Sequence, residues 1–80
     1  MNDQEILTRI TTLVDEETDL RRRHAGDGLH TDDQARMHAL QVQLDQCWDL
    51  LRQRRALREF GGDPDAAHVR DESTVEKYEQ

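Results

Sequence analysis

Aromatic residues, proline and cysteine are scarce in this chain of 80 residues. Its three aromatic residues are Trp48, Phe60 and Tyr78. Hydrophobic residues make up 34% of the sequence and charged residues 36%, a balance typical of long helices and coiled coils rather than of an ordinary globule. A chain of this length can hold one domain at most, and its small core is expected to need help from a partner.

Positive charge is also in short supply, since 11 Lys and Arg face 18 Asp and Glu and leave a net charge of −7. Because nonspecific binding to phosphate backbones and anionic membranes needs an excess of Lys and Arg, we expect neither nucleic acid nor membrane as a partner. No apolar run approaches the roughly 18 residues of a membrane span. The single Cys47 excludes an internal disulfide, and the N-terminus lacks the layout of a signal peptide, which predicts a cytoplasmic protein.

The first part of the chain has the period of an amphipathic helix. Asn2 and Glu5 have the spacing of a capping box, in which each side chain satisfies a free amide of the first turn. Basic residues at 21–24 and the flexible Gly26 mark the other end, so a helix is predicted over residues 3–25. The apolar residues on one side of it are Ile6, Leu7, Ile10, Leu13, Val14 and Leu20.

A second helix is predicted over residues 32–60. It follows a turn at 26–31, with Thr31 and Gln34 repeating the capping-box spacing, and ends before Gly61. A turn this short makes the second helix run back antiparallel along the first. The apolar residues on its main face are Met37, Leu40, Leu44, Cys47, Trp48 and Leu51.

The two apolar stripes match when the chain folds back on itself near the glycines of the turn. Since both helices rise equally per residue, facing positions have numbers that sum to about 57. The residues expected to form this paired core are Ile6, Ile10, Leu13, Leu20, Met37, Leu40, Leu44, Cys47 and Leu51. We therefore predict an all-α fold, a coiled-coil-like antiparallel helical hairpin.

The second helix has more apolar surface than one neighbour can cover. Its further apolar residues are Ala39, Leu50 and Leu57. With these its apolar side spans about 180°, so something besides the first helix must pack on it. A second copy of the chain would give a homodimeric four-helix bundle, which we favour. In the alternative, the tail folds back through Val69, Val75 and Tyr78.

Residues 61–80 form an acidic tail that we expect to be mostly mobile. Two local signals allow short helical turns within it. Asp63 before Pro64 suits a helix N-terminus, and Ser73 with Glu76 again has the capping-box spacing. Helical segments of this length are marginal by themselves.

Glu17 interrupts the apolar stripe of the first helix, where a carboxylate must be paired or hydrated. His24 follows on the same face, and the pairing rule places Asp33 opposite it. A weak candidate metal site is therefore Glu17, His24 and Asp33, because carboxylate and imidazole suit Zn or Fe. Neither helix has the Glu-x-x-His motif of di-iron bundles, so we favour a solvated end at which Glu17 pairs with Arg21 or Arg36, and we expect no cofactor.

The end of the second helix carries the candidate partner-binding surface. Trp and Arg dominate the energetics of protein interfaces. The residues proposed for it are Trp48, Arg54, Arg55, Leu57, Arg58 and Phe60. In the favoured alternative, these arginines pair with the acidic start of the first helix at Asp3 and Glu5.

Catalytic chemistry has little support in the sequence. Cys47 on the core face is interpreted as a small buried hydrophobe rather than a reactive thiol, since no His or acid lies one turn away to act as a base. No other residue pairs a nucleophile with a base, and no loop could cradle a phosphate. We do not expect an enzyme.

Three stretches resemble a known family. They are LDQCWDLLRQRRALRE at 44–59, DQEILTRITTLV at 3–14 and GDPDAAHVR at 62–70. Through them, nearly the whole chain resembles a short actinobacterial domain family of unknown function. The resemblance implies a small cytoplasmic helical protein and no known activity. We expect an interaction module or adaptor that binds a protein through its Arg/Trp helix end and acidic tail, with a metal- or anion-binding bundle as the alternative.

Overall fold

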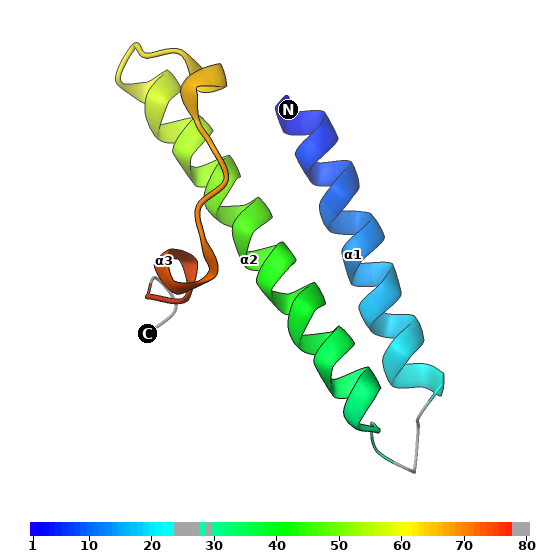
Figure 1. Cartoon of the computed structure of the whole chain (residues 1–80). Helices are drawn as coiled ribbons and strands as arrows, with labels where there is room; N and C mark the ends of the chain where they lie inside the picture. The colour runs from blue at the N-terminus through cyan, green and yellow to red at the C-terminus, as the bar shows by residue number, and fades with distance from the viewer. Residues whose placement is uncertain (24–27, 29, 78–80) are drawn as a thin grey trace.

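The computed structural model of the chain is a pair of long antiparallel helices, with a C-terminal segment packed along one of them (Figure 1). It describes residues 1–23, residue 28 and residues 30–77. The elements are α1 (Asp3–Arg23), α2 (Thr31–Glu59), the 3-10 helix η1 (Pro64–Ala66) and α3 (Glu72–Lys77). The predicted helical hairpin is confirmed. No helix within the described ranges is long and apolar enough to cross a membrane.

The capping box that starts α1 is confirmed. The Asn2 amide donates to Glu5 Oε1 at 3.0 Å, and the Glu5 amide donates to Asn2 Oδ1 at 2.8 Å. At the other end α1 reaches Arg23, with three arginines in its last turn to offset the negative end of the helix dipole. The rest of the predicted helix, at 24–25, lies outside the described residues.

Both ends of α2 differ slightly from the prediction. Thr31 is the first helical residue rather than the cap, and the N-cap is His30, whose side chain makes no capping bond. The predicted Thr31 capping box is therefore wrong. At the C-terminal end the helix stops at Glu59, and Gly61 has φ +75°, the left-handed conformation that glycine tolerates best. The Gly62 amide then donates to the Leu57 carbonyl at 2.7 Å and closes the last turn.

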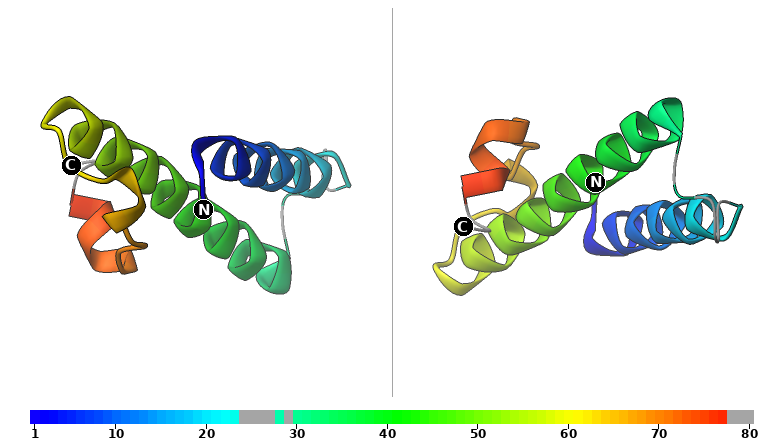
Figure 2. Two further views of the ribbon diagram at one scale, coloured as in Figure 1. Left: turned by 90° about the horizontal axis from the view of Figure 1, so that it is seen from above. Right: turned by 90° about the horizontal axis from the view of Figure 1, so that it is seen from below.

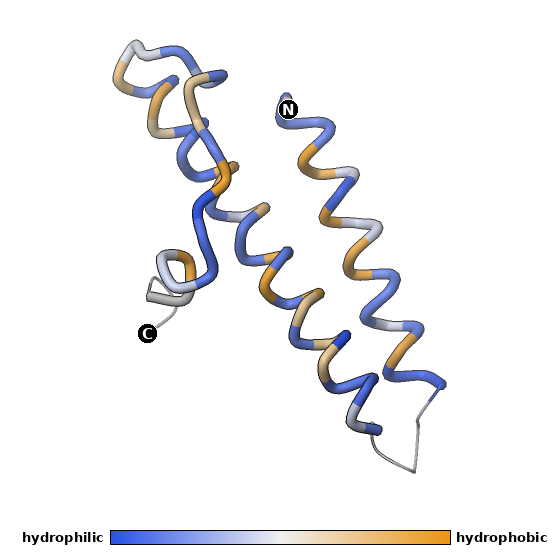
Figure 3. Tube along the Cα trace, in the orientation of Figure 1, coloured by the Kyte–Doolittle hydropathy of each residue, from blue (hydrophilic) through white to orange (hydrophobic). Residues whose placement is uncertain are grey.

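Apolar residues recur along both helices between hydrophilic ones, and they meet in two clusters (Figure 3). The cluster nearer the turn contains Leu13, Leu20, Met37 and Leu40. The cluster nearer the chain start contains Ile6, Ile10 and Leu50, with Leu51 and Ala67 partly buried against it. Leu44 and Cys47 pack against both. Each of the nine residues predicted for the paired core thus lies in or against a cluster, although Leu50 is more deeply buried than Leu51.

Leu7 and Val14 do not belong to this core. Their side chains are 43% and 42% exposed. The apolar stripe of α1 is wide, but α2 is the only element that packs on α1 in the described structure. One neighbouring helix cannot cover both edges of a wide stripe, so one edge is left open.

The tail contains the short helical turns that its sequence allowed, and they pack on α2. Figure 2 shows α3 on the side of α2 that faces away from α1. Val75 in α3 is 1% exposed. Asp63 caps η1 as predicted, whereas Asp71 caps α3 by accepting from the Thr74 amide at 2.8 Å, so the predicted Ser73 cap is wrong. Tyr78 lies outside the described residues.

Candidate functional site

The open end of the hairpin is closed by Arg54, whose side chain is only 8% exposed. Its Nε donates to Asp3 Oδ1 at 2.6 Å. Its Nη1 donates to Asp65 Oδ1 at 2.9 Å and to the Pro64 carbonyl at 3.1 Å. One guanidinium therefore joins α1, α2 and η1. The donors of Arg54 are therefore used within the chain, as in the charge pairing favoured from the sequence.

Two further arginines of this end, Arg55 and Arg58, are also paired. Arg58 Nη2 lies 2.7 Å from Asp3 Oδ2, and Arg55 Nε lies 3.0 Å from Glu59 Oε1. Hydrogen bonds from Arg58 and then Arg54 lower the pKa of Asp3, and the bonds to Asp3 and Asp65 raise the pKa of Arg54. The arrangement is the charge pairing across the hairpin end rather than an open cationic patch.

The apolar members of the predicted surface are separated in space. Leu57 and Phe60 line a hollow of about 330 Å³ between the end of α2 and η1, to which Ala66 and His68 also contribute. Phe60 is 88% exposed. Trp48 does not line this hollow. The six residues proposed from the sequence therefore do not form one continuous site.

Polar contacts hold the C-terminal segment against α2. Gln46 and Gln53 donate from Nε2 to the carbonyls of Arg70 and His68, at 3.1 and 2.7 Å. Asp49, 3% exposed, accepts from Gln53 Nε2 at 2.8 Å and lies 3.5 Å from Arg70 Nε. These residues were not singled out from the sequence. The available signal was their three- and four-residue spacing along one side of α2.

His38 adds a further contact between α2 and this segment. Its Nε2 lies 2.9 Å from Oε1 of Glu72, at the start of α3. The ties therefore run along much of α2, and Val75 of the same segment is buried.

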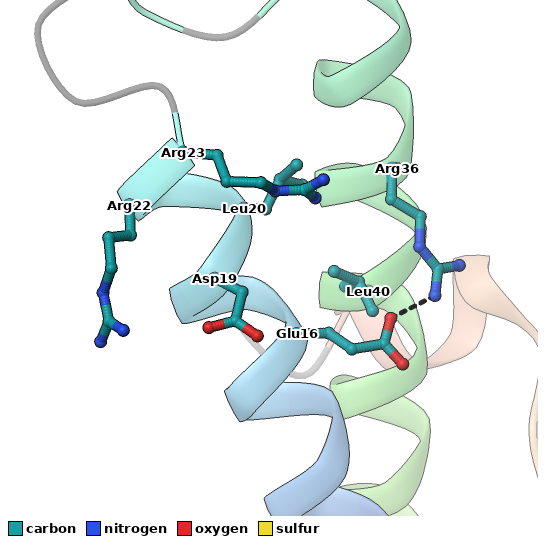
Figure 4. Close-up of a pocket in the computed structure, with 7 residues that line it drawn as sticks. All are labelled: Glu16, Asp19, Leu20, Arg22, Arg23, Arg36 and Leu40. Carbon is teal, nitrogen blue, oxygen red and sulfur yellow. Dashed lines mark hydrogen bonds and ion pairs between the residues drawn. The ribbon is translucent and has the colours of Figure 1, made fainter.

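Two cross-helix contacts define one side of the seam between α1 and α2, which we call the polar flank. Arg9 Nη2 donates to Gln43 Oε1 at 2.9 Å. Nearer the turn, Arg36 donates to Glu16 (Figure 4). The polar flank also includes Met1 and Val69, which line a hollow of about 230 Å³ beside Arg9 and Gln43.

The opposite side of the seam is apolar, and we call it the open flank. Residues two apart on a helix point roughly 160° from each other, and Leu7 and Val14 each precede one of the polar-flank residues of α1 by two positions. Trp48, five positions after Gln43, is turned roughly 140° from it on α2. Leu7, Val14 and Trp48 thus share a flank, on which Trp48 is 45% exposed. The open flank comprises Leu7, Val14, Leu44, Trp48 and Leu51.

The charged residues that border the open flank form ion pairs with one another. At the turn end Glu17, with a side chain 14% exposed, lies 3.2 Å from Arg21 Nη1. That is one of the two partners expected for Glu17. At the other end Arg55 pairs with Glu59. The apolar centre of the flank is therefore bordered by neutralised charge.

Only part of the candidate metal site lies among the described residues. His24 lies outside the described residues, and Asp33 is partly buried near the start of α2. In the described part of the chain, no group of three or more His, Cys, Asp and Glu is placed to hold a metal ion.

A hollow of about 380 Å³ lies on the polar flank near the turn (Figure 4). Arg22, Arg23 and Arg36 contribute to its lining, but so do Glu16 and Asp19. In Figure 4 Arg36 reaches toward Glu16, while Arg22 extends away from the other side chains. An anion entering this hollow would meet two carboxylates, so its mixed charge does not favour anion binding.

Cys47 is partly buried between the two core clusters. Burial raises the pKa of its thiol, and the nearby charge of Arg9 opposes this only in part. A raised pKa lowers the thiolate fraction at neutral pH and hence the nucleophilicity of the residue. The environment of Cys47 is that of a packing residue.

Comparison with known proteins is consistent with the family resemblance seen in the sequence. The profile of a family described as "Protein of unknown function (DUF2630)" matches residues 2–80. Uncharacterized protein Rv0898c of Mycobacterium tuberculosis and uncharacterized protein Mb0922c of Mycobacterium bovis are each 50% identical to the chain over 78 residues. The alignments cover 95% of this chain and 88% of each relative. No solved structure matches significantly.

Proposed function

Since this chain belongs to the DUF2630 family of proteins of unknown function, its role must be argued from its own surfaces, and we propose that it is a non-catalytic protein-interaction module that binds through the open flank. The family supplies no activity to transfer. The proposal keeps the interaction role expected from the sequence but moves the binding surface from the arginine-rich helix end to the apolar side of the hairpin.

The observation that carries this proposal is the alignment of exposed apolar side chains from both helices. A single exposed leucine or valine is ordinary on a protein surface. Here Leu7, Val14 and Trp48 are each more than two-fifths exposed and share one flank, with Leu44 and Leu51 partly buried between them. Exposed apolar side chains that gather on one face mark sites of protein association, and tryptophan is enriched among the residues that dominate binding energy.

Other surfaces offer less to a partner. Arg54 and Arg58 are tied to Asp3, and the described part of the acidic tail is docked on α2. The metal- or anion-binding alternative finds no ligand cluster among the described residues, and we do not pursue it.

Photocrosslinking in cells tests the proposed function. The photoreactive residue p-benzoyl-phenylalanine replaces Trp48 in one strain and Val69 in another, and the full chain is produced in a mycobacterial host. We expect ultraviolet light to attach the position-48 variant to a protein, either a second copy of the chain or a different protein, and to leave the position-69 variant unattached. No adduct from position 48, nor from the same replacement at Leu7 or Val14, would overturn the proposal.

A further inference from the structure

We infer that the occupant of the open flank is a second copy of this chain, so that two hairpins stack flank to flank as a four-helix bundle. This inference rests on the proposed function and names its partner. It follows from the shape of the molecule, from the unequal covering of its two long helices, and from the charge along the flank.

The isolated chain exposes more surface than its size requires. Its accessible surface is 5655 Å², about 650 Å² above the roughly 5,000 Å² expected of a compact monomer of 9.4 kDa. Its radius of gyration is 14.9 Å, against roughly 12 Å for a compact domain of this length. A standard protein interface buries about 800 Å² on each partner, so the excess is close to what one subunit contributes to a stable dimer.

The two long helices are covered unequally. α2 packs against α1 on one side and against η1 and α3 on another, whereas α2 is the one helix that packs on α1 among the described residues. The hairpin layer is consequently thin, and the shortest extent of the molecule is 16 Å. The tail leaves the open flank bare, because its Val69 lies with the polar-flank residues Arg9 and Gln43. A second hairpin placed on the open flank would give α1 its missing neighbour.

Charge along the flank suits a copy of the same surface. A two-fold interface brings one patch against itself, so every group on it must tolerate its own kind. The centre of this flank is apolar, and the charged residues at its border already form the ion pairs Glu17–Arg21 and Arg55–Glu59. The net charge of −7 would repel a second copy at an acidic surface, but the pairs that border this flank carry no net charge. A strongly charged partner would find no complementary charge there.

Light scattering coupled to gel filtration, run on the full chain over a range of concentrations, tests the inference. We expect a mass of twice 9.4 kDa at high concentration. Val14→Lys should return the mass to that of one chain, while Val69→Lys should remain dimeric. The two valines form a matched pair, since both are exposed, at 42% and 58%, and only Val14 lies on the open flank. Each lysine changes the net charge by the same amount, so loss of the dimer in Val14→Lys alone would come from the charge placed on the open flank.

The outcomes separate this inference from the proposed function. A wild-type mass that stays at one chain would overturn the dimer, while crosslinking of position 48 to another protein would still support an interaction module. A dimer that persists in Val14→Lys would place the interface elsewhere and would also overturn the inference. Should Val14→Lys lose its helical circular dichroism, Trp48→Ala serves as the second flank variant, because a truncation at this half-exposed site leaves both core clusters intact.

Discussion

Arg54 and Asp3 are joined by a hydrogen bond of 2.6 Å between residues 51 positions apart in the chain. The same guanidinium also holds Asp65, so the end of α2 is linked to the start of α1 and to η1. Arginine suits this position because its planar fork presents several donors in fixed directions.

Replacing Arg54 with lysine should loosen this end of the molecule. Lysine keeps the positive charge but cannot reach Asp3 and Asp65 with a rigid fork. We expect a lower midpoint of urea unfolding and faster hydrogen exchange at residues 63–67. Arg55→Lys is the control, since Arg55 is exposed and makes a single local pair, and it should change stability by less than about 0.5 kcal/mol. Equal effects of the two substitutions would contradict the role given to Arg54.

The Asp3 carboxylate should make stability depend on pH in the acid range. Arg58 and Arg54 lower its pKa in the folded chain below the ordinary value of 3.8. A group whose pKa is depressed by folding adds stability that is complete above its unfolded pKa and is lost as the pH falls through the folded pKa. Asp3→Asn should therefore have a lower free energy of unfolding than the wild type at pH 7. On acidification below about pH 4, its free energy of unfolding should fall less than that of the wild type. Urea unfolding of both proteins at pH 7 and below pH 4 checks this. An equal loss of stability on acidification in the two proteins would refute it.

Truncating a core side chain should lower the free energy of unfolding far more than truncating an open-flank side chain does in the monomer. Leu13 is fully buried, and Leu13→Ala should lower the free energy of unfolding by about 2–5 kcal/mol. Leu7, 43% exposed, should lose less than about 1 kcal/mol in Leu7→Ala when measured at a concentration at which the chain is monomeric. Chemical denaturation of both variants provides the comparison, and a larger loss for Leu7→Ala would mean that the burial assigned to α1 is wrong.

The C-terminal segment should detach without unfolding the hairpin. Val75 is the buried apolar anchor of α3, and the other ties of the segment to α2 are mainly polar. In Val75→Asp we expect rapid hydrogen exchange at residues 63–77, with α1 and the first half of α2 still protected. Val69→Asp, at an exposed position of the same segment, is the matched control and should leave exchange unchanged. Loss of protection throughout α1 in Val75→Asp would show that the segment and the hairpin unfold as one unit.

Cys47 should react slowly while the chain is folded. Burial raises the pKa of the thiol, which leaves less thiolate available, and the surrounding core limits access. Alkylation by iodoacetamide at pH 8 should be slower in buffer than in concentrated urea. Equal rates in the two conditions would mean that Cys47 is open to solvent.

The hairpin could be predicted from the sequence because helical periodicity is a local signal. Ile10, Leu13 and Leu20 recur at helical spacing, and the short turn leaves an antiparallel return as the only simple path. Leu7 and Val14 follow the same spacing, yet they are exposed. Periodicity shows which residues share one side of a helix, but the area that the neighbouring helix covers decides which of them are buried.

The docking of the tail was harder to predict because it depends on polar contacts between distant residues. Asp49, Gln53 and Arg70 show no apolar pattern, and their partners are partly backbone carbonyls. The helix caps show a related limit. Asp71 and Ser73 are both good capping residues, and the packing of Val75 on α2 selects where α3 begins.

Fluorescence of Trp48 reports directly on whether the open flank is covered, because Trp48 is the only tryptophan in the chain and lies on this flank. As the protein concentration is raised through the range in which the mass doubles, we expect the Trp48 emission to shift to the blue and acrylamide to quench it less. Emission and quenching that stay constant while the chain dimerises, or a chain that never dimerises and keeps Trp48 exposed, would contradict the claim that the open flank binds a second copy.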